Sequence, residues 1–435
     1  MKIKKISLTK FRLFDSLVLE FPNSNCITLI GENGGGKSSV LDAISLGLDF
    51  FTGKLRSLTN EYSDLNNLKR EDIKIGSNEA KVEITFDNNL SVNIHRSIGQ
   101  YQSLYFTNSN DTVLSGYRSS LKADTIDSLP LLCYYRINRI ITFENQSKSL
   151  EYSSSYHEML EAYYNAFDGK LSSFQDFKRW FINQENLENE RKIDEGKLHY
   201  QLPSLKVVRD SIIHFFNEIE EGYFHNLKGK RKGETRLNYE DNYQSDIVIF
   251  KEKTSLKLSQ LSSGEKAMLL LVSDIARRLA ILNKDHTKAL KGEGIVLIDE
   301  IDLHLHPRWQ RRIIPALRKT FPNIQFIVTT HSPQVLSTTT ENSILVLSKG
   351  THYSVNSDPK GRDSNGILEE VMGVEKRPKE IERQIENIFT HLSNGSFSES
   401  WIADQIKELK LHISQDDPVL LRINNLIKRK RLLAK

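Results

Sequence analysis

The chain has 435 residues, of which 38% are hydrophobic and 27% are charged, and its formal net charge is +4 at pH 7. This composition is typical of one composite globular core or two modest ones, and it excludes disordered and membrane-embedded classes. No apolar stretch reaches the ~20 residues of a membrane-spanning helix, no signal peptide is evident, and the two cysteines are too few for a disulfide framework. We therefore expect a cytoplasmic protein with no membrane partner.

The first hundred residues predict strands, one helix and a hairpin. Strands are expected at residues 2–8, 16–21 and 26–30, and a helix at 37–51 follows a Gly-rich turn. Residues 80–86 and 90–95 alternate between apolar and polar side chains around Asp87-Asn88-Asn89. This pattern predicts a hairpin with one buried face.

The middle of the chain has a different character. Helical spacing occurs at residues 156–167, 174–187 and 204–224, which predicts a helical insertion, and the basic segment 227–236 is expected to be a loop. Strands at 246–251, 294–299, 325–330 and 343–348 then alternate with helices at 263–282 and 307–320. Such alternation predicts an α/β fold with a mixed sheet whose central strands are parallel. After about residue 365 the pattern is helical to the end.

A phosphate-binding loop is indicated where the third strand meets the first helix. The segment Gly31–Ser38 fits G-x-x-x-x-G-K-[ST], in which glycines let backbone N–H groups wrap closely around phosphates. Lys37 would reach the β- and γ-phosphates of ATP, and the Ser38 hydroxyl would ligate Mg²⁺. The other nucleotide-binding candidates in this segment are Asn33, Gly34, Gly35, Gly36 and Ser39. The alternative is an ordinary Gly-rich turn before a helix.

Two acids follow a buried strand near residue 299. In a parallel sheet the carboxyl ends of the strands face the nucleotide. Asp299 would therefore hold Mg²⁺ through water, and Glu300 would orient or deprotonate the attacking water. The alternative is a strand that ends in two solvated acids.

The helix expected at 263–282 has a capped start. Ser262 is followed three residues later by Glu265, the pattern of a capping box, and this alone would account for the start of the helix. A capped helix end also presents free N–H groups that can bind an anion, so a structural and a functional interpretation are compatible.

Taken together, these residues resemble the ABC-class ATPases of the SMC-like and RecF-like branch. The resemblance implies that Ser262 and Gly264 belong to the signature motif, which binds the γ-phosphate of a nucleotide held by another protomer. It also implies a γ-phosphate-sensing role for His331, an interface loop at Asp302, and a nucleotide contact for Arg12 in the Lys10-Phe11-Arg12 motif. His304 and His306 lack the further ligands that a metal site would need.

The run 292–336, with Leu129–Tyr135 and Ser173–Phe181, resembles more specifically the PtuA ATPases of Septu anti-phage systems and their retron-associated relatives. This resemblance implies an ATPase head at 1–139 and 246–360, a helical insertion at 140–245, and a C-terminal helical partner or oligomerisation region at 361–435. It further implies Mg-ATP, a nucleotide-sandwich homodimer or larger assembly, and a separate nuclease of the HNH type. No HNH or TOPRIM nuclease pattern is evident in this chain.

Two other functions remain open from the sequence. In a RecF-like DNA-repair or chromosome-maintenance ATPase, the chain itself would clamp DNA through the basic runs 228–236, 308–319 and 428–431, which are otherwise solvated faces. An ATP-binding subunit of a membrane transporter is the third class. The glutamine that completes many ABC sites has no clear position here, and Gln100 and Gln102 are the candidates.

Overall fold

The computed structural model describes residues 1–57, 67–88, 90–99, 103–107, 112–136, 158–167, 174–230, 246–251, 254–355, 358–374, 377–393 and 399–433. The chain divides into two compact units, Met1–Arg362 and Asp363–Lys435. The nucleotide-binding candidates all lie in the first unit.

A six-stranded sheet forms the centre of the first unit. Its strand order is β14 (Thr351–Ser354), β13 (Ile344–Ser348), β3 (Cys26–Gly31), β12 (Ile324–Thr329), β11 (Gly294–Ile298) and β7 (Leu131–Tyr135). All neighbours pair in parallel except β14, which is antiparallel to β13. The predicted mixed sheet with central parallel strands is thus confirmed. Its parallel strands bring the ends of β3, β12, β11 and β7 to one edge.

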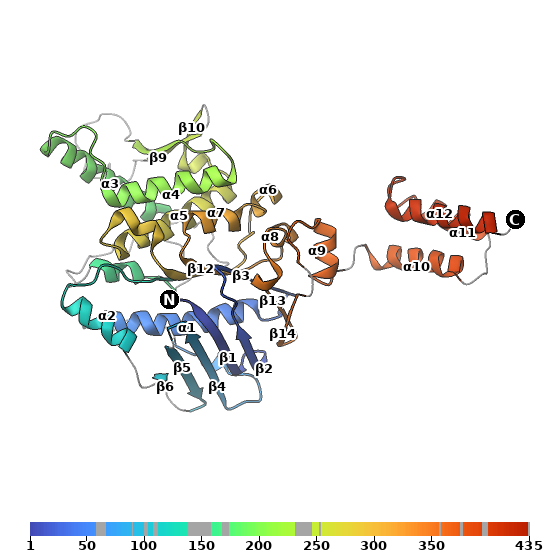
Figure 1. Ribbon diagram of the computed structural model, residues 1–435, viewed down its shortest axis with the longest axis horizontal. Coiled ribbons are helices and arrows are strands. Elements are labelled where there is room, and N and C mark those ends of the chain that lie inside the picture. The colour runs from blue at the N-terminus through green and yellow to red at the C-terminus, as the bar shows by residue number, and fades with distance from the viewer. Residues whose placement is uncertain are drawn as a thin grey trace. The chain divides into compact units, whose positions relative to one another are not determined.

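A second, antiparallel sheet carries the N-terminal strands. Its order is β2 (Phe14–Glu20), β1 (Ile3–Phe11), β4 (Glu79–Phe86), β5 (Ser91–Ser97) and β6 (Ser103–Thr107). The predicted hairpin is confirmed as the β4–β5 pair, in which Val82 lies opposite Ile94. Helix α1 (Lys37–Arg56) contacts strands of both sheets and therefore packs between them (Figure 1). Helix α2 (Thr112–Lys122) packs against α1.

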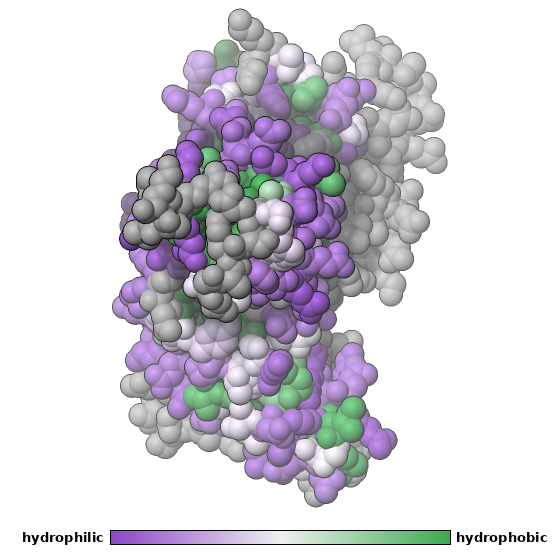
Figure 2. Space-filling view, turned by 90° about the vertical axis from the view of Figure 1, so that its right-hand side faces the viewer, coloured by the Kyte–Doolittle hydropathy of each residue, from purple (hydrophilic) through white to green (hydrophobic). Residues whose placement is uncertain are grey.

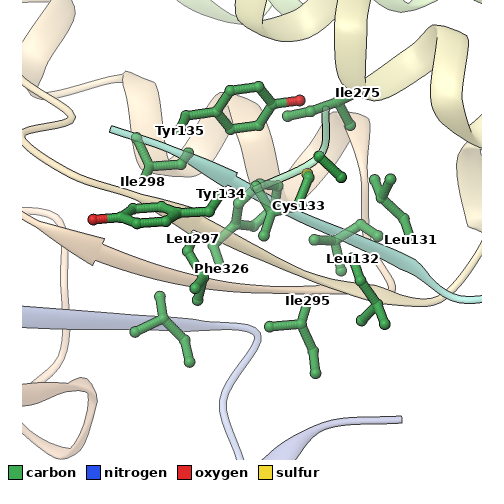
Figure 3. Close-up of a cluster of buried hydrophobic side chains, with 14 of the residues drawn as sticks. Leu131, Leu132, Cys133, Tyr134, Tyr135, Ile275, Ile295, Leu297, Ile298 and Phe326 are labelled. Carbon is green, nitrogen blue, oxygen red and sulfur yellow. The ribbon is translucent and has the colours of Figure 1, made fainter. Parts of the chain in front are cut away.

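The core of the six-stranded sheet explains its central position. Every residue of β7, β11 and β12 is buried, as expected for strands covered on both faces. Figure 3 shows Tyr134 and Tyr135 on opposite sides of β7, with Tyr135 turned toward Ile275. Ile275 belongs to the long helix α5 (Ser263–Leu282), which contacts β7.

Helices and a small sheet pack around α5. Helix α4 (Pro203–Ile219) contacts α5 extensively, and α3 (Phe174–Asp194) contacts both of them. A three-stranded antiparallel sheet has the order β10 (Thr254–Lys257), β9 (Asp246–Lys251) and β8 (Asn226–Lys230). The predicted helical insertion therefore contains a strand as well as helices.

The predicted continuous helix at 307–320 was wrong. The structure has two helices there, α6 (Pro307–Gln310) and α7 (Ile313–Thr320), separated by a turn. Pro315 explains the break, because it has no N–H to donate to the carbonyl of Arg311 and its ring would clash with that carbonyl. The short helix α8 (Pro333–Leu336) follows β12.

Two further local predictions were wrong. Within the segment predicted to be helical at 156–167, the described part is a 3₁₀ helix at Glu158–Tyr163 followed by turns. The carbonyls of Ala162 and Tyr164 accept hydrogen bonds from Arg278 of α5, so tertiary contacts replace the helical ones. Part of the basic loop predicted at 227–236 is strand β8, because Leu227 is fully buried there, and residues 231–236 lie outside the described residues.

The second unit has its own small core. Helices α10 (Lys379–Ser393), α11 (Glu399–Leu409) and α12 (Pro418–Leu433) bury a shared set of side chains, and the short α9 (Ser364–Glu370) precedes them. The buried residues of this core are Ile385, Ile388, Leu392, Ile402, Leu409, Leu420 and Ile423. This agrees with the helical pattern of the sequence after residue 365.

The described helices were compared with the length and hydropathy that a membrane span requires. No helix in the described part of the chain is both long and apolar enough to cross a bilayer. The face shown in Figure 2 is largely hydrophilic where the residues are coloured, with small and separate hydrophobic areas.

Candidate functional site

The loop between β3 and α1 depends on its glycines. Gly31 has φ +145°, and a Cβ there would lie 1.9 Å from the carbonyl oxygen of Leu347 on β13. Gly36 has φ +98° as the N-cap of α1, and a Cβ there would lie 2.3 Å from the Phe14 ring. These two positions allow the loop to lie close to β13 and β2, with the N–H groups of the first turn of α1 at its centre.

Lys37 lies across this loop. Its Nζ donates hydrogen bonds to the carbonyls of Gly31 (2.9 Å) and Glu32 (3.0 Å). Burial lowers the pKa of Lys37, while the charges of Asp299 and Glu300 act in the opposite direction. The predicted loop lysine therefore shares one electrostatic environment with the two predicted acids.

The other loop residues differ in how exposed they are at the start of α1. Asn33, Gly34 and Ser38 are exposed, Ser39 is half-buried and Gly35 is buried. The exposed positions can be reached by a ligand from solvent.

The acids after β11 are held by one hydroxyl. Thr329 Oγ1, at the end of β12, donates to Asp299 Oδ1 at 2.6 Å and accepts from the Glu300 backbone N–H at 2.7 Å. The Asp299 N–H donates to the carbonyl of Tyr135 at 2.9 Å. Asp299 is 4% exposed and Glu300 is half-buried. The Asp299 carboxylate and the Glu300 backbone are therefore held at the sheet edge that the sequence predicted.

His331 and Asp302 lie at the same edge. Asp302 accepts a hydrogen bond from Thr330, the residue after β12, and His331 is the next residue along. Burial lowers the pKa of His331, the Lys37 charge lowers it further, and Asp302 and Asp299 oppose the shift. The imidazole is therefore within electrostatic range of both Lys37 and Asp299.

Arg12 reaches α1 from the turn after β1. Its Nε donates to Asp72 (2.8 Å), and its Nη1 donates to Asp42 (2.7 Å) and lies 3.4 Å from the Ser39 hydroxyl. Burial acts against the charge, but the hydrogen bonds to Asp42 and Asp72 outweigh it and raise the pKa of Arg12. The predicted nucleotide-contact arginine is thus held beside Ser39.

The start of α5 is a complete capping box. Ser262 accepts from the Glu265 N–H at 3.3 Å, and the Ser262 N–H donates to Glu265 Oε2 at 2.8 Å. Glu265 Oε1 also accepts hydrogen bonds from Tyr223 and Lys251. Ser262 is exposed, so this helix end is open to a ligand while its side chains are satisfied.

Gly264 joins the start of α5 to the turn after β11. A Cβ at this position would lie 2.7 Å from the His304 carbonyl oxygen, which no side chain could tolerate without a shift. The structure therefore brings Gly264 against the loop that contains Asp302. His306 has a local role, since its Nδ1 accepts from the Arg308 N–H and caps α6.

A buried ion pair connects α5 to β7. Asp274 accepts hydrogen bonds from Arg278 Nε (2.7 Å), Arg277 Nη2 (2.8 Å) and the Tyr135 hydroxyl (2.9 Å). These hydrogen bonds and charges overcome burial and hold the pKa of Asp274 well below its usual range. Because Tyr135 also accepts from the Asp299 N–H, the helix that begins at the capping box is linked to the predicted metal-binding acid.

The residues at the end of β7 were not among the predicted site residues. Tyr134 and Arg136 contact Asp42 of α1, although they are more than ninety positions apart in sequence. The only local signal was an arginine directly after an apolar run, which is weak. The glutamine candidates Gln100 and Gln102 lie outside the described residues.

The oxygen donors present suit a magnesium ion. The Ser38 hydroxyl and the Asp299 carboxylate are hard ligands, and Mg²⁺ on nucleotides commonly takes one or two protein oxygens and completes its shell with phosphates and water. Within the described ranges, no cluster of three or more His, Cys, Asp or Glu side chains could hold a metal by itself. The arrangement therefore fits a metal that arrives with a nucleotide.

Basic side chains of the run 308–319 are bound to other residues of the same chain. Arg308 pairs with Glu220 at 3.3 Å and Lys319 with Glu218 at 2.6 Å, both acids lying at the end of α4. Arg312 donates to the Ile219 carbonyl at 2.7 Å. These residues join α4 to α6 and α7, which accounts for the run without DNA.

Comparisons with known proteins indicate the family of this chain. Residues 26–337 match the family described as "AAA domain, putative AbiEii toxin, Type IV TA system". The chain is 31% identical to the "Retron Ec83 probable ATPase" of Escherichia coli, over 97% of this chain and 86% of that protein. It is 26% identical to the "Septu protein PtuA" of Bacillus mycoides, over 96% of this chain and 51% of that protein.

Among solved structures, an SMC head bound to the C-terminal winged-helix domain of ScpA is similar at 19% identity and a TM-score of 0.45. The similarity covers 82% of this chain and 98% of that one.

Proposed function

The chain belongs to the AAA-domain family matched at residues 26–337 and is an ATPase, and from this membership we propose that it is the ATP-dependent switch of an anti-phage defence complex. In this proposal Mg-ATP binds between two copies of the chain and regulates a separate nuclease of the HNH type. The resemblance to retron and Septu ATPases supports the defence role. The cytoplasm is the compartment we expect for it.

One observation carries the nucleotide site. Three adjacent parallel strands, β3, β12 and β11, are followed by Lys37, His331, and Asp299 with Glu300, respectively. Lys37 is coupled electrostatically to the other three residues. Ligands in open α/β sheets bind at the carboxyl ends of the strands. The residues therefore suit an anionic ligand that needs both a cation and a general base.

The roles follow from the chemistry of each group. Lys37 and the first N–H groups of α1 bind the β- and γ-phosphates. Ser38 and Asp299 would hold Mg²⁺, which, when bound, neutralises charge that develops on the phosphate oxygens. Glu300 Oε accepts a proton from the attacking water and aligns it, and His331 donates to the γ-phosphate. Arg12 contacts the nucleotide beside Ser39.

The second half of the site is proposed to come from another copy. Ser262 and Gly264 lie at the capped start of α5, where Ser262 is exposed and Gly264 is buried. Such a helix end attracts an anion through its dipole. A γ-phosphate bound from both sides joins the two copies, and its hydrolysis releases them, so the nucleotide sets the geometry that a docked nuclease would sense.

Mixing two inactive variants tests the shared site. Lys37→Ala disables the loop and Ser262→Arg the signature, so each variant alone should hydrolyse no ATP. In a mixed dimer one site combines the intact loop of one copy with the intact signature of the other. Random mixing should restore about a quarter of wild-type turnover, because half of the dimers are mixed and each has one intact site.

A second mixture serves as the control. Lys37→Ala mixed with Glu300→Gln should stay inactive, because both changes disable groups on the same copy's side of the site. Thermal melting verifies that both variants are folded. If the first mixture of folded variants then hydrolyses no ATP, a nucleotide shared between copies is excluded. The partner is tested separately by identifying which protein co-purifies with the native chain.

A DNA clamp of the RecF type is not favoured. In the basic run 308–319, Arg308, Arg312 and Lys319 are bound to the end of α4, and no observation on the described residues supports direct contact with DNA. Steeply salt-dependent DNA binding by the isolated chain would reverse this assignment.

A further inference from the structure

Strand β7 ends directly beside the acids of the nucleotide site. It pairs in parallel with β11, so that Tyr135 lies opposite Ile298, and the Asp299 N–H donates to the Tyr135 carbonyl at 2.9 Å. The next residue, Arg136, is therefore the neighbour of Asp299 at the same sheet edge. This is the edge to which the phosphates of a bound nucleotide would come.

The alternation of the strand turns Arg136 toward α1. Tyr135 points to α5, where its hydroxyl donates to Asp274. Tyr134 lies on the other side of the strand, as Figure 3 shows, and Arg136 follows it with the same two-residue period. Both reach Asp42 on α1: Arg136 Nη2 is 3.2 Å from Asp42 Oδ1, and the Tyr134 hydroxyl is hydrogen-bonded to the same carboxylate.

Asp42 shares a helix face with the predicted metal ligand. It lies four residues after Ser38, one turn further along α1. The Tyr134 phenol is buried among Asp42 and Asp299, and burial and both carboxylates raise its pKa. Tyr134 therefore lies within electrostatic range of Asp42 on the helix and Asp299 on the sheet, next to the position proposed for the metal.

Arg136 is only partly engaged by the described residues around it. Its Nη2 pairs with Asp42, its Nε is buried without a hydrogen-bond partner among the described residues, and the side chain is 42% exposed. Its guanidinium carbon lies 5.1 Å from the centre of the Tyr134 ring, so the ring supports the planar group from one side. Asp42 also pairs with Arg12, so that one carboxylate orients two guanidiniums.

We propose that Arg136 is a further nucleotide-binding residue, which donates to the terminal phosphates of ATP, and that Asp42 and Tyr134 are its positioning residues. The inference rests on the proposed function. A guanidinium presents a rigid fork of N–H donors that matches phosphate oxygens.

The test compares ATP with ADP. Nucleotide dissociation constants are measured by titration calorimetry on the full chain with Mg²⁺. Because Arg136 neighbours Asp299, Arg136→Ala should weaken ATP about 10- to 100-fold, as expected for loss of a charge-assisted hydrogen bond, and ADP much less. Arg136→Lys keeps the charge but loses the fork and should recover part of the ATP affinity. Asp42→Asn should fall between wild type and Arg136→Ala.

Two control variants distinguish the role of Arg136 from the proposed function on which it rests. Arg118→Ala, a similar change on α2, should bind both nucleotides as the wild type does, and Lys37→Ala should bind neither. Wild-type ATP affinity in a folded Arg136→Ala, or an equal loss of ATP and ADP, would overturn the role of Arg136 and leave the proposed function intact. Should Arg136→Ala fail to fold, Arg136→Lys decides in the same way. No ATP binding by the wild-type chain would overturn the proposed function itself.

Discussion

Thr329 determines how the two site acids are presented. Glu300 has φ +46°, which is uncommon for a residue with a side chain and costs about 1–2 kcal/mol. Its N–H is held by the Thr329 hydroxyl, which also orients the Asp299 carboxylate. Such strain is commonly found at functional sites.

Glu300→Gln should separate binding from hydrolysis. The amide keeps the shape of the side chain but cannot accept a proton from water, so turnover should fall about 100- to 10,000-fold while ATP affinity stays unchanged. Closed dimers should accumulate with Mg-ATP, as measured by light scattering. The exposed Glu83→Gln on β4 is the matched control. Wild-type turnover in Glu300→Gln would remove this residue from the mechanism.

At the level of residues, local motifs were predictable and long-range neighbours were not. The loop Gly31–Ser38 and the acids after β11 could be placed because each lies next to an apolar strand in the sequence. The contacts of Asp42 with Arg12 and Arg136 could not be predicted, since they join three distant segments. A single sequence holds no signal for such pairs.

Among the elements, α5 connects several distant parts of the first unit. Its capping box contacts Tyr223 and Lys251, its middle binds Tyr135 through Asp274, and Arg278 reaches the 3₁₀ segment at Glu158–Tyr163. The start and end of this helix were predicted correctly, because a capping box and a periodic apolar face are both local signals. The break between α6 and α7 was missed, although Pro315 gave a local reason for it.

Glu265 should make stability depend on pH. Burial raises the pKa of Glu265, but hydrogen bonds from Ser262, Tyr223 and Lys251 outweigh it and leave the pKa below its ordinary value. A lowered carboxyl pKa stabilises the fold above the pKa of the unfolded chain, and this stabilisation is lost as the pH falls through the folded value. Glu265→Gln should therefore lose about 1–3 kcal/mol at pH 7 and less at pH 3.

Thermal unfolding at several pH values measures this effect. The melting temperature of Glu265→Gln should fall less steeply between pH 6 and pH 3 than that of the wild type, so the two curves converge in acid. Parallel curves would mean that Glu265 contributes nothing through its charge. Glu83→Gln again provides the exposed control.

For the whole molecule, the two units have separate cores. The residues of the proposed nucleotide site lie in Met1–Arg362, and Asp363–Lys435 has its own buried cluster. Helix α12 has basic but no acidic side chains, including Arg422, Lys428 and Arg429. We expect this second unit to serve the partner or the assembly rather than the nucleotide.

Removing the second unit should leave nucleotide binding intact. A chain that ends at Arg362 should fold and bind ATP within about twofold of the full-length affinity, because the two cores are independent. It should lose any nuclease that co-purifies with the full-length chain. Calorimetry and pull-down measure the two properties. A shortened chain that no longer binds ATP would show that the second unit completes the site.

The glycine at position 264 has a consequence for assembly. The start of α5 lies directly against the His304 carbonyl. The segment with Ser262 and Gly264 therefore packs against the turn that follows Asp299 and Glu300. We therefore expect a second copy to meet these two segments as a single surface. A displacement of the turn at His304 should then move the start of α5 with it.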